Sequence, residues 1–158
     1  RLKNRMCIHF NISHSGNRAF LAVSDTETGI DMEQQRSYNI DIAHNYYSKE
    51  ENTFLLKQIS CEKTRTFYKI WSLKESYIKA LGLGLTKDLN SFSVITSYGD
   101  IKIKDFETPK NNNLWNLFYR QIAPDYHLSA CYHIKNNEPS IKIFNSIELI
   151  NLFLTINT

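Results

Sequence analysis

The chain has 158 residues, 42% hydrophobic and 22% charged, a mixture typical of one globular domain or of two small lobes that share a core. Its net charge is only +3 and its basic residues form no dense stripe, which argues against nucleic-acid binding. No apolar run is long enough to cross a bilayer, and no secretory signal opens the chain. The three cysteines are widely spaced and fit neither a disulfide framework nor a zinc site. We therefore expect a cytoplasmic protein with reduced thiols and no membrane partner.

The first sixty residues predict short strands followed by short helices. A strand should end at a loop over Asn11–Gly16, and the next expected elements are strands Arg18–Ser24 and Gly29–Glu33, joined by the polar turn Asp25–Thr28, and an amphipathic helix Ile40–Tyr47. Ser48 and Glu51 form a capping box, which predicts a helix that starts after Ser48 and runs toward Gln58.

The longest helical pattern, Cys61–Leu81, is stopped by Gly82 and Gly84. The chain then changes to β patterns, and the predicted strands are Phe92–Ser97, Ile101–Lys104, Leu114–Tyr119 and Leu128–Ile134, with a hairpin turn at Tyr98–Asp100. Asn145 can cap a last helix, Ile147–Leu154, with Glu148 in the capping-box position. The sequence therefore predicts an α+β fold with mostly antiparallel strands packed on one long helix.

Asp31 and Glu33 share one face of the expected strand Gly29–Glu33, because alternate residues of a strand point to the same side. The two residues are then about 7 Å apart, so their charges repel. A bound cation would remove that repulsion, and carboxylate oxygens suit Mg²⁺, which leaves much of its shell to water or phosphate. The alternative is a strand with a solvated acidic face, which a D-x-E tripeptide fits equally well.

Lys74 interrupts the apolar stripe of the long helix, which is formed by Phe67, Ile70, Tyr77, Ile78 and Leu81. A lysine at that position must either extend to solvent or meet an anion, because a buried unpaired ammonium is costly. Glu75 lies at the edge of the stripe with Lys79 one turn later. These two residues form either a surface ion pair or part of a site in which Glu75 holds a metal and the lysines hold phosphates.

His14 stands among small polar residues in the expected loop Asn11–Gly16, which glycine closes. Such a loop can approach a ligand with backbone and side chain together, and His14 could donate to a phosphate oxygen. The alternative is a loop histidine that is hydrogen-bonded to the backbone.

Three blocks of the sequence occur together in a specific order: Phe10–Gly16 (FNISHSG), Gly29–Glu33 (GIDME) and Trp71–Ala80 (WSLKESYIKA). In this order they closely resemble the signature blocks of the Sfp-type 4′-phosphopantetheinyl transferases. The resemblance continues through Gly82–Leu85 and Ser91–Val94 and covers nearly all of the chain up to about Ile134.

The resemblance implies a ligand and a role for each singled-out residue. Asp31, Glu33 and Glu75 would hold Mg²⁺, or Mn²⁺, together with the pyrophosphate of coenzyme A. Ser13 and His14 would bind the coenzyme A phosphates, and Lys74 and Lys79 would contact phosphate and assist catalysis. Glu75, directly or through a metal-bound water, would be the base for the acceptor serine.

The reaction that the resemblance implies transfers the 4′-phosphopantetheine group of coenzyme A to a serine of an acyl or peptidyl carrier protein. The other product is 3′,5′-ADP. The resemblance does not specify which carrier protein is the acceptor.

Proteins of this type carry two similar lobes, and most of the first is missing here. We therefore expect residues 1–24 to be a remnant of the first lobe and residues 25–158 to form the catalytic lobe, with self-association or a separate N-terminal segment supplying the rest. The basic residues Arg1, Lys3 and Arg5 do not clearly match those that grip coenzyme A in the missing part.

Two other functions fit the same residues. Carboxylate clusters beside a lysine also serve Mg²⁺-dependent phosphohydrolases and nucleases. An inactive paralogue could bind coenzyme A or a carrier protein without catalysis, although intact Asp31, Glu33 and Glu75 argue against decay.

Overall fold

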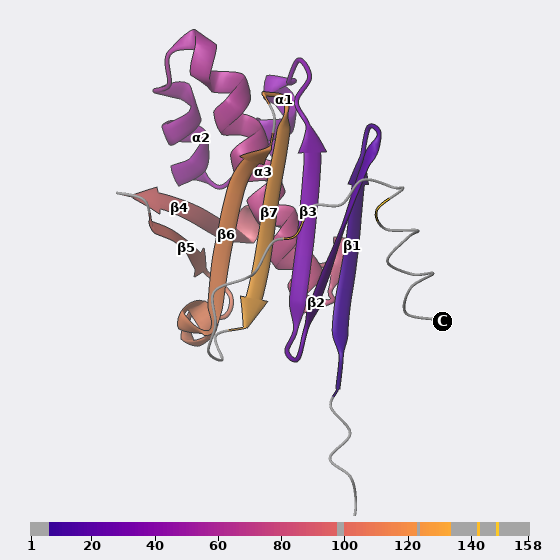
Figure 1. Cartoon of the computed structure of the whole chain (residues 1–158). Helices are drawn as coiled ribbons and strands as arrows, with labels where there is room; N and C mark the ends of the chain where they lie inside the picture. The colour runs from indigo at the N-terminus through magenta and orange to yellow at the C-terminus, as the bar shows by residue number, and fades with distance from the viewer. Residues whose placement is uncertain (1–6, 98–99, 123, 134–141, 143–147, 149–158) are drawn as a thin grey trace, which may run out of the picture.

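A computed structural model describes residues 7–97, 100–122 and 124–133 and the single positions 142 and 148. Within these residues the fold is α+β: antiparallel strands form three small sheets, and one long helix crosses behind the central sheet (Figure 1). The strands are β1 (His9–Ser15), β2 (Arg18–Ser24), β3 (Thr28–Gln34), β4 (Phe92–Ser97), β5 (Asp100–Asp105), β6 (Trp115–Ile122) and β7 (Tyr126–His133). The helices are α1 (Ile40–Tyr46), α2 (Lys49–Leu56) and α3 (Ser60–Leu81), with 3-10 turns at Gly84–Thr86, Leu89–Ser91 and Pro109–Leu114.

The predicted fold class is confirmed, and so are most of the element positions. Ser48 caps α2 through the predicted capping box, and Gly82 ends α3 in the left-handed conformation (φ 67°) that favours glycine. The turn at 98–99, the N-terminal residues Arg1, Lys3 and Arg5, and all of the predicted helix 147–154 except position 148 lie outside the described residues.

The central sheet has the strand order β3-β7-β6, and all of its pairs are antiparallel. Its strand β3 packs closely on helix α3 at Gly29, where an added Cβ would overlap the backbone oxygen of Ser76 and the backbone nitrogen of Ala80. Glycine is therefore required at position 29, and the close approach brings the last two turns of α3 beside the acidic residues of β3.

Strands β1 and β2 form a separate two-stranded hairpin in which Ser13 pairs with Phe20 and Ile12 with Leu21. The expectation of a loop over Asn11–Gly16 is wrong: Asn11 to Ser15 belong to β1, and the turn occupies only Gly16 and Asn17. Pairing with β2 provides the hydrogen bonds that make this polar stretch extended, and these bonds are not visible in its local composition.

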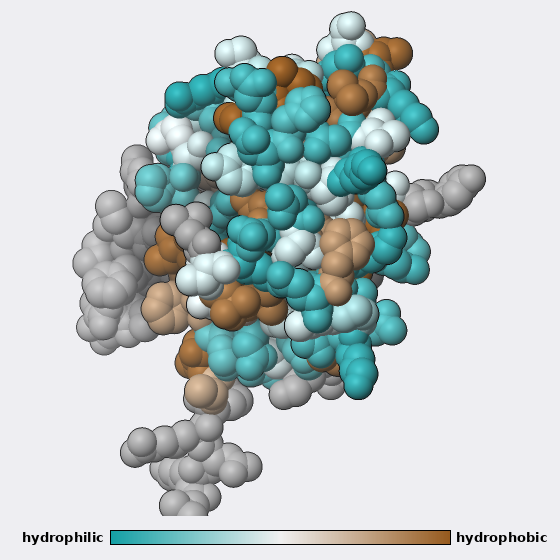
Figure 2. Space-filling model, turned by 180° about the vertical axis from the view of Figure 1, so that it is seen from behind, coloured by the Kyte–Doolittle hydropathy of each residue, from teal (hydrophilic) through white to brown (hydrophobic). Residues whose placement is uncertain are grey.

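The two faces of the hairpin differ. Phe20 and Ala22 pack inward on a core formed by Ile30, Met32, Tyr126 and Leu128. On the outer face, large apolar side chains are 57% to 68% exposed; these are Ile8, Phe10, Ile12, Leu21 and Val23. In Figure 2 some of the hydrophobic side chains lie on the left half of the molecule, the side on which the hairpin lies in that view.

Helices α1 and α2 lie beside the first half of α3, and their shared core consists of Ala43, Tyr47, Leu55, Phe67 and Ile70. A further core cluster joins the second half of α3 to β4, β5 and β7 through Leu73, Tyr77, Phe92, Ile103 and Cys131. Helix α3 therefore packs on the central sheet and on β4, and its Lys79 also reaches Ser13 of the hairpin, which gives the helix a fixed position next to β3. No helix among the described residues is long and apolar enough to cross a membrane.

His127 on β7 is fully buried, and we predict that it makes the protein sensitive to acid. Its Nδ1 lies 2.8 Å from the Tyr119 hydroxyl and its Nε2 lies 2.9 Å from Gln35 Oε1, so a neutral ring with its proton on Nε2 satisfies both contacts. Burial and the nearby charge of Arg65 lower the pKa of His127 to about 4. Between pH 6.5 and about 4 the unfolded chain binds a proton that the folded chain does not, so stability falls as the pH falls.

Between pH 6.5 and about 4 the free energy of unfolding should fall by on the order of 3 kcal/mol. Urea unfolding at pH 7 and pH 5 should show a smaller acid-induced loss for His127→Gln than for the wild type, whereas His44→Gln, at an exposed position, should behave as the wild type. Equal losses in all three proteins would contradict the assignment of the acid sensitivity to His127.

Candidate active site

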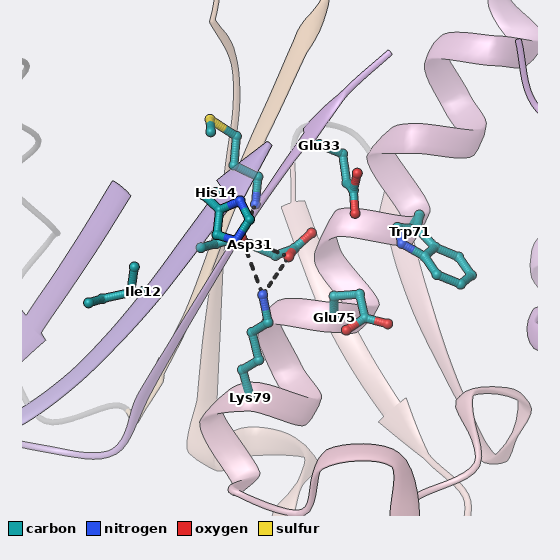
Figure 3. A pocket seen from close by; sticks show the side chains of 9 residues that line it. Ile12, His14, Asp31, Glu33, Trp71, Glu75 and Lys79 are labelled. Carbon is teal, nitrogen blue, oxygen red and sulfur yellow. Dashed lines mark hydrogen bonds and ion pairs between the residues drawn. The ribbon is translucent and has the colours of Figure 1, made fainter. Parts of the chain in front are cut away.

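A pocket of about 380 Å³ opens between β1, β3 and α3 (Figure 3). It is lined by Ile12, Ser13, His14, Asp31, Met32, Glu33, Trp71, Glu75 and Lys79. The three sequence blocks thus meet at one place, each on its own element. Six of the seven residues predicted for the site line this pocket: Ser13, His14, Asp31, Glu33, Glu75 and Lys79.

Asp31 lies at the centre of the pocket and is 3% exposed. Its Oδ1 accepts hydrogen bonds from Lys79 Nζ at 2.7 Å and from the Ser13 hydroxyl at 3.2 Å. Its Oδ2 is buried and has no hydrogen-bond partner among the described residues. Burial raises the pKa of Asp31, although Lys79 and Ser13 oppose the rise. One carboxylate oxygen of Asp31 therefore remains available for a ligand.

Glu33 and Glu75 line the same pocket from β3 and α3, beside Trp71 (Figure 3). Burial, reinforced by the negative charges of Asp31 and Glu75, raises the pKa of Glu33 to about 7, and a hydrogen bond from Trp71 opposes this rise. The pKa of Glu75 is also raised by burial and by the charge of Asp31. The three carboxylates thus repel one another, and a cation among them would be stabilised.

The residues present fit a Mg²⁺ ion by chemistry. The donors are oxygens, one buried carboxylate oxygen has no partner, and the charges of the three acids favour a cation. In this conformation, however, no group of three or more His, Cys, Asp or Glu side chains within the described part of the chain is close enough to hold a metal. Lys79 is bound to Asp31 instead and supplies part of the positive charge that the acids require.

Ser13 and Lys79 differ in how open they are to a ligand. Ser13 is 5% exposed, and its hydroxyl accepts from the Met32 amide at 3.1 Å and from Lys79 Nζ at 3.3 Å. The Lys79 side chain is 29% exposed and reaches into the pocket. His14 is exposed on the hairpin side of the pocket. Lys79 and His14 are thus accessible to an anion, whereas Ser13 mainly orients Asp31.

Lys74 does not lie where its expected role requires. It is fully buried, and its Nζ donates to Glu51 Oε1 at 2.9 Å, to Glu51 Oε2 at 2.7 Å and to the Phe92 carbonyl at 2.7 Å. All three of its protons are therefore used inside the protein, and it does not line the pocket. Of the two outcomes that the sequence left open for Lys74, extension to solvent or an anionic partner, the structure shows the second, but the anion is Glu51 from α2 rather than a phosphate.

Four residues at or near the site were not assigned a role from the sequence. Trp71, Ile12 and Met32 line the pocket, and Glu51 neutralises Lys74. Trp71 stands one turn before Glu75 on α3, so helical spacing alone places it on the same face. Glu51 was recognised only as a helix cap, and no local signal predicts its ion pair with a residue of another helix.

The chain is similar in sequence to known proteins of one superfamily. The model of the 4′-phosphopantetheinyl transferase superfamily matches residues 27–131. The chain is 37% identical over 124 residues to the 4′-phosphopantetheinyl transferase Sfp of Bacillus subtilis, a match that covers 78% of this chain and 54% of Sfp. The chain thus spans about half the length of the curated relatives that it matches.

Two solved structures share the fold. The holo-[acyl-carrier-protein] synthase of Thermotoga maritima has a TM-score of 0.56 at 19% identity, over 70% of this chain and 64% of that protein. An ACPS–CoA complex from Chronobacterium ammoniagenes has a TM-score of 0.50 at 14% identity, over 70% of this chain and 98% of that protein. The match of the family model to most of the chain, together with the three blocks that meet in the pocket, shows that the chain belongs to the 4′-phosphopantetheinyl transferase superfamily.

Proposed function

We propose that this chain transfers the 4′-phosphopantetheine group of coenzyme A to a serine of an acyl or peptidyl carrier protein. The observation that carries the proposal is the pocket, in which Asp31, Glu33 and Glu75 have raised pKa values next to the accessible Lys79. Such a site suits a polyanionic substrate that arrives with a cation. The ACPS–CoA complex, a protein of the same fold, supports coenzyme A as the donor.

The chemistry follows from the positions of these groups. The hydroxyl oxygen of the acceptor serine forms a bond to the phosphorus at the pantetheine end of the pyrophosphate, and the bond from that phosphorus to the bridging oxygen breaks. The 3′,5′-ADP leaves with the bond electrons, and Glu75 takes the proton of the serine hydroxyl. Glu75 is the candidate for this role because its carboxylate lines the pocket beside Lys79, and a well-placed base contributes about 10²–10⁴-fold to the rate.

The residues that would hold Mg²⁺ are Asp31, Glu33 and Glu75, and the ion when bound would offset negative charge on the phosphate oxygens. Lys79 can contribute to the same effect, because its ammonium lies in the pocket and is accessible. His14 can donate to a phosphate from the opposite wall. Trp71 lies beside Glu33, lowers the pKa of its carboxyl, and forms an apolar boundary of the pocket.

We also propose that the chain is divided near residue 25. The hairpin β1–β2 forms a sheet of its own, and the match to the superfamily model begins at residue 27. These observations support assigning residues 1–24 to the first lobe of the two-lobed relatives and the following residues to the catalytic lobe, with Ser13 reaching across the boundary to Asp31 and His14 lining the same pocket.

The transfer activity is tested by incubating the protein with coenzyme A, Mg²⁺ and several apo-carrier proteins, followed by mass spectrometry of the carriers. Attachment of phosphopantetheine should appear as a single mass increase on a carrier whose serine is intact, and not on a serine-to-alanine carrier. Cleavage of nucleic acid or of a simple phosphate ester without any carrier would instead support the phosphohydrolase alternative. Binding of coenzyme A or of a carrier without a mass increase would support an inactive paralogue.

The affinity for coenzyme A should depend on Lys79 and His14, two accessible side chains of the pocket that can donate hydrogen bonds to a phosphate. We predict that Lys79→Ala raises the dissociation constant of coenzyme A by about tenfold, the effect of losing a charge-assisted hydrogen bond worth about 1.5 kcal/mol. His14→Ala should weaken binding less, because His14 is exposed and water can replace its hydrogen bond to the ligand. Isothermal titration calorimetry measures both changes. An exposed lysine outside the pocket gives a matched control, since Lys57→Ala should bind as the wild type. Unchanged affinity in both pocket variants would remove these residues from the phosphate site.

The outer face of the hairpin provides a further expectation. Five large apolar side chains on this face are 57% to 68% exposed, which is an unusual concentration for an isolated soluble protein. We propose that the chain self-associates through this face. Light scattering at rising concentration should give a mass above that of the monomer, and Leu21→Asp should restore the monomer, because a buried charge at this face is costly. A monomeric wild type at all concentrations would contradict the proposal.

A further inference from the structure

Strand β3, which carries Asp31 and Glu33, is an edge strand of the central sheet, because its sheet order is β3-β7-β6. Successive amide groups of a strand point alternately to its two sides. The amides of Ile30, Met32 and Gln34 therefore point away from β7, toward the hairpin. An edge strand of this kind exposes unpaired backbone donors unless another group accepts from them.

Side chains of β1 accept from all three amides. The Ile30 amide donates to Asn11 Oδ1 at 3.0 Å, the Met32 amide to Ser13 Oγ at 3.1 Å, and the Gln34 amide to Ser15 Oγ at 3.0 Å. The acceptors stand at every second position of β1 and the donors at every second position of β3. The two strands are thus joined by a ladder of side-chain acceptors, whereas β1 forms its backbone ladder with β2.

This ladder sets the register of β1 against β3. Alternation along β1 directs Asn11, Ser13 and Ser15 toward β3, while Ile12 and His14 lie on the opposite face and border the pocket. A shift by one residue would exchange these two sets of side chains. Only the present register allows the Ser13 hydroxyl to reach Asp31 Oδ1 and to accept from Lys79.

We infer that Asn11 and Ser15 are positioning residues for the wall of the pocket that β1 forms through Ser13 and His14, where coenzyme A would bind. Neither side chain is directed to the pocket; each acts through the β1 residues between them, Ser13 and His14. The inference rests on the proposed function, because it assumes that coenzyme A binds at this wall. It accounts for the polar residue at every second position of β1, in a strand whose other face is largely apolar.

The predicted effects are selective. In Asn11→Ala and in Ser15→Ala the dissociation constant and the KM of coenzyme A should each rise about tenfold, since the strand loses the hydrogen bond that places Ser13 and His14 at the pocket. The KM for the carrier should not change. The conservative variants Asn11→Asp and Ser15→Thr keep an acceptor oxygen and should restore coenzyme A binding. Ser24→Ala, on the same hairpin but bonded to Thr26, is the matched control and should behave as the wild type.

The experiment combines calorimetry with coenzyme A, steady-state kinetics in both substrates, and hydrogen exchange of single amides. Exchange of the Ile30 amide should accelerate in Asn11→Ala but not in Asn11→Asp, and that of the Gln34 amide should accelerate in Ser15→Ala. A fall in kcat that only follows the folded fraction, with both KM values unchanged, would mean that the residues are merely structural and would overturn the inference. Wild-type affinity for coenzyme A in both alanine variants would overturn it as well.

Failure of the proposed function would look different. In that case the wild type would bind no coenzyme A and modify no carrier, while amide exchange would still report on the ladder. Unchanged exchange of the Ile30 and Gln34 amides in the alanine variants would overturn the ladder irrespective of any activity.

Discussion

Glu75→Gln should lower the rate of carrier modification by about 10²–10⁴-fold, the contribution of a well-placed general base. The amide keeps the size of the side chain but cannot take the proton of the acceptor serine. Asp31→Ala and Glu33→Ala should reduce the rate at least as much, because each removes an oxygen donor from the proposed Mg²⁺ site. The rate is measured by mass spectrometry of a carrier protein over time.

The fold should survive these changes. The pKa values of Glu33 and Glu75 are raised by burial and by neighbouring acids, so neutralising either side chain removes repulsion. Glu33→Gln is the mildest variant, since it retains an acceptor for Trp71. Glu62→Gln, at the start of the same helix and in a surface pair with Arg65 at 3.8 Å, is the matched control and should be fully active.

Removal of the metal tests the same site independently of any substitution. EDTA should stop the transfer and Mg²⁺ should restore it in the wild type. Near-normal turnover by Glu75→Gln would exclude the role of base that is assigned to Glu75. Full activity of the wild type in EDTA would exclude the metal site at Asp31, Glu33 and Glu75.

Lys74→Met should destabilise the protein by about 3–5 kcal/mol, the usual cost of removing one partner from a buried ion pair. Glu51 is 2% exposed and would be left with a buried negative charge. The same carboxylate also accepts from the Ser48 amide at 2.8 Å and from the Val94 amide at 2.7 Å, so α2, α3 and β4 all meet at this group. Urea unfolding at constant pH measures the change.

A second substitution separates charge from packing. Glu51→Gln added to Lys74→Met neutralises the orphaned carboxylate and keeps an acceptor oxygen for one of the two amides, so the double variant should recover part of the lost stability. Lys57→Met, at an exposed position, should have almost no effect. If Lys74→Met is as stable as the wild type and instead weakens coenzyme A binding, then the expected phosphate role of Lys74 is correct and the structural role is wrong.

Local sequence determined the elements that depend on near neighbours. The capping box of Ser48 and Glu51 and the glycine end of α3 involve residues at most a few positions apart, so their hydrogen bonds follow from short-range spacing. The same holds for the shared face of Asp31 and Glu33, which strand alternation predicts. Of the residues expected in the site, those on β3 and on the last turns of α3 reached the pocket, except Lys74.

Tertiary structure decided the rest. The pairing of β3 with β7 joins residues about a hundred positions apart, and the hydrogen bonds of Asn11, Ser13 and Ser15 connect two strands through side chains. The sequence around Asn11–Gly16 suggested a loop because its residues are small and polar, but those residues are acceptors for a neighbouring edge strand. Lys74 shows the same limit: its position in an apolar stripe left open whether it extends to solvent or pairs with an anion. Only the packing of α2 on α3 shows that it pairs with Glu51, since a buried charge takes whichever partner the folded chain brings within hydrogen-bond distance.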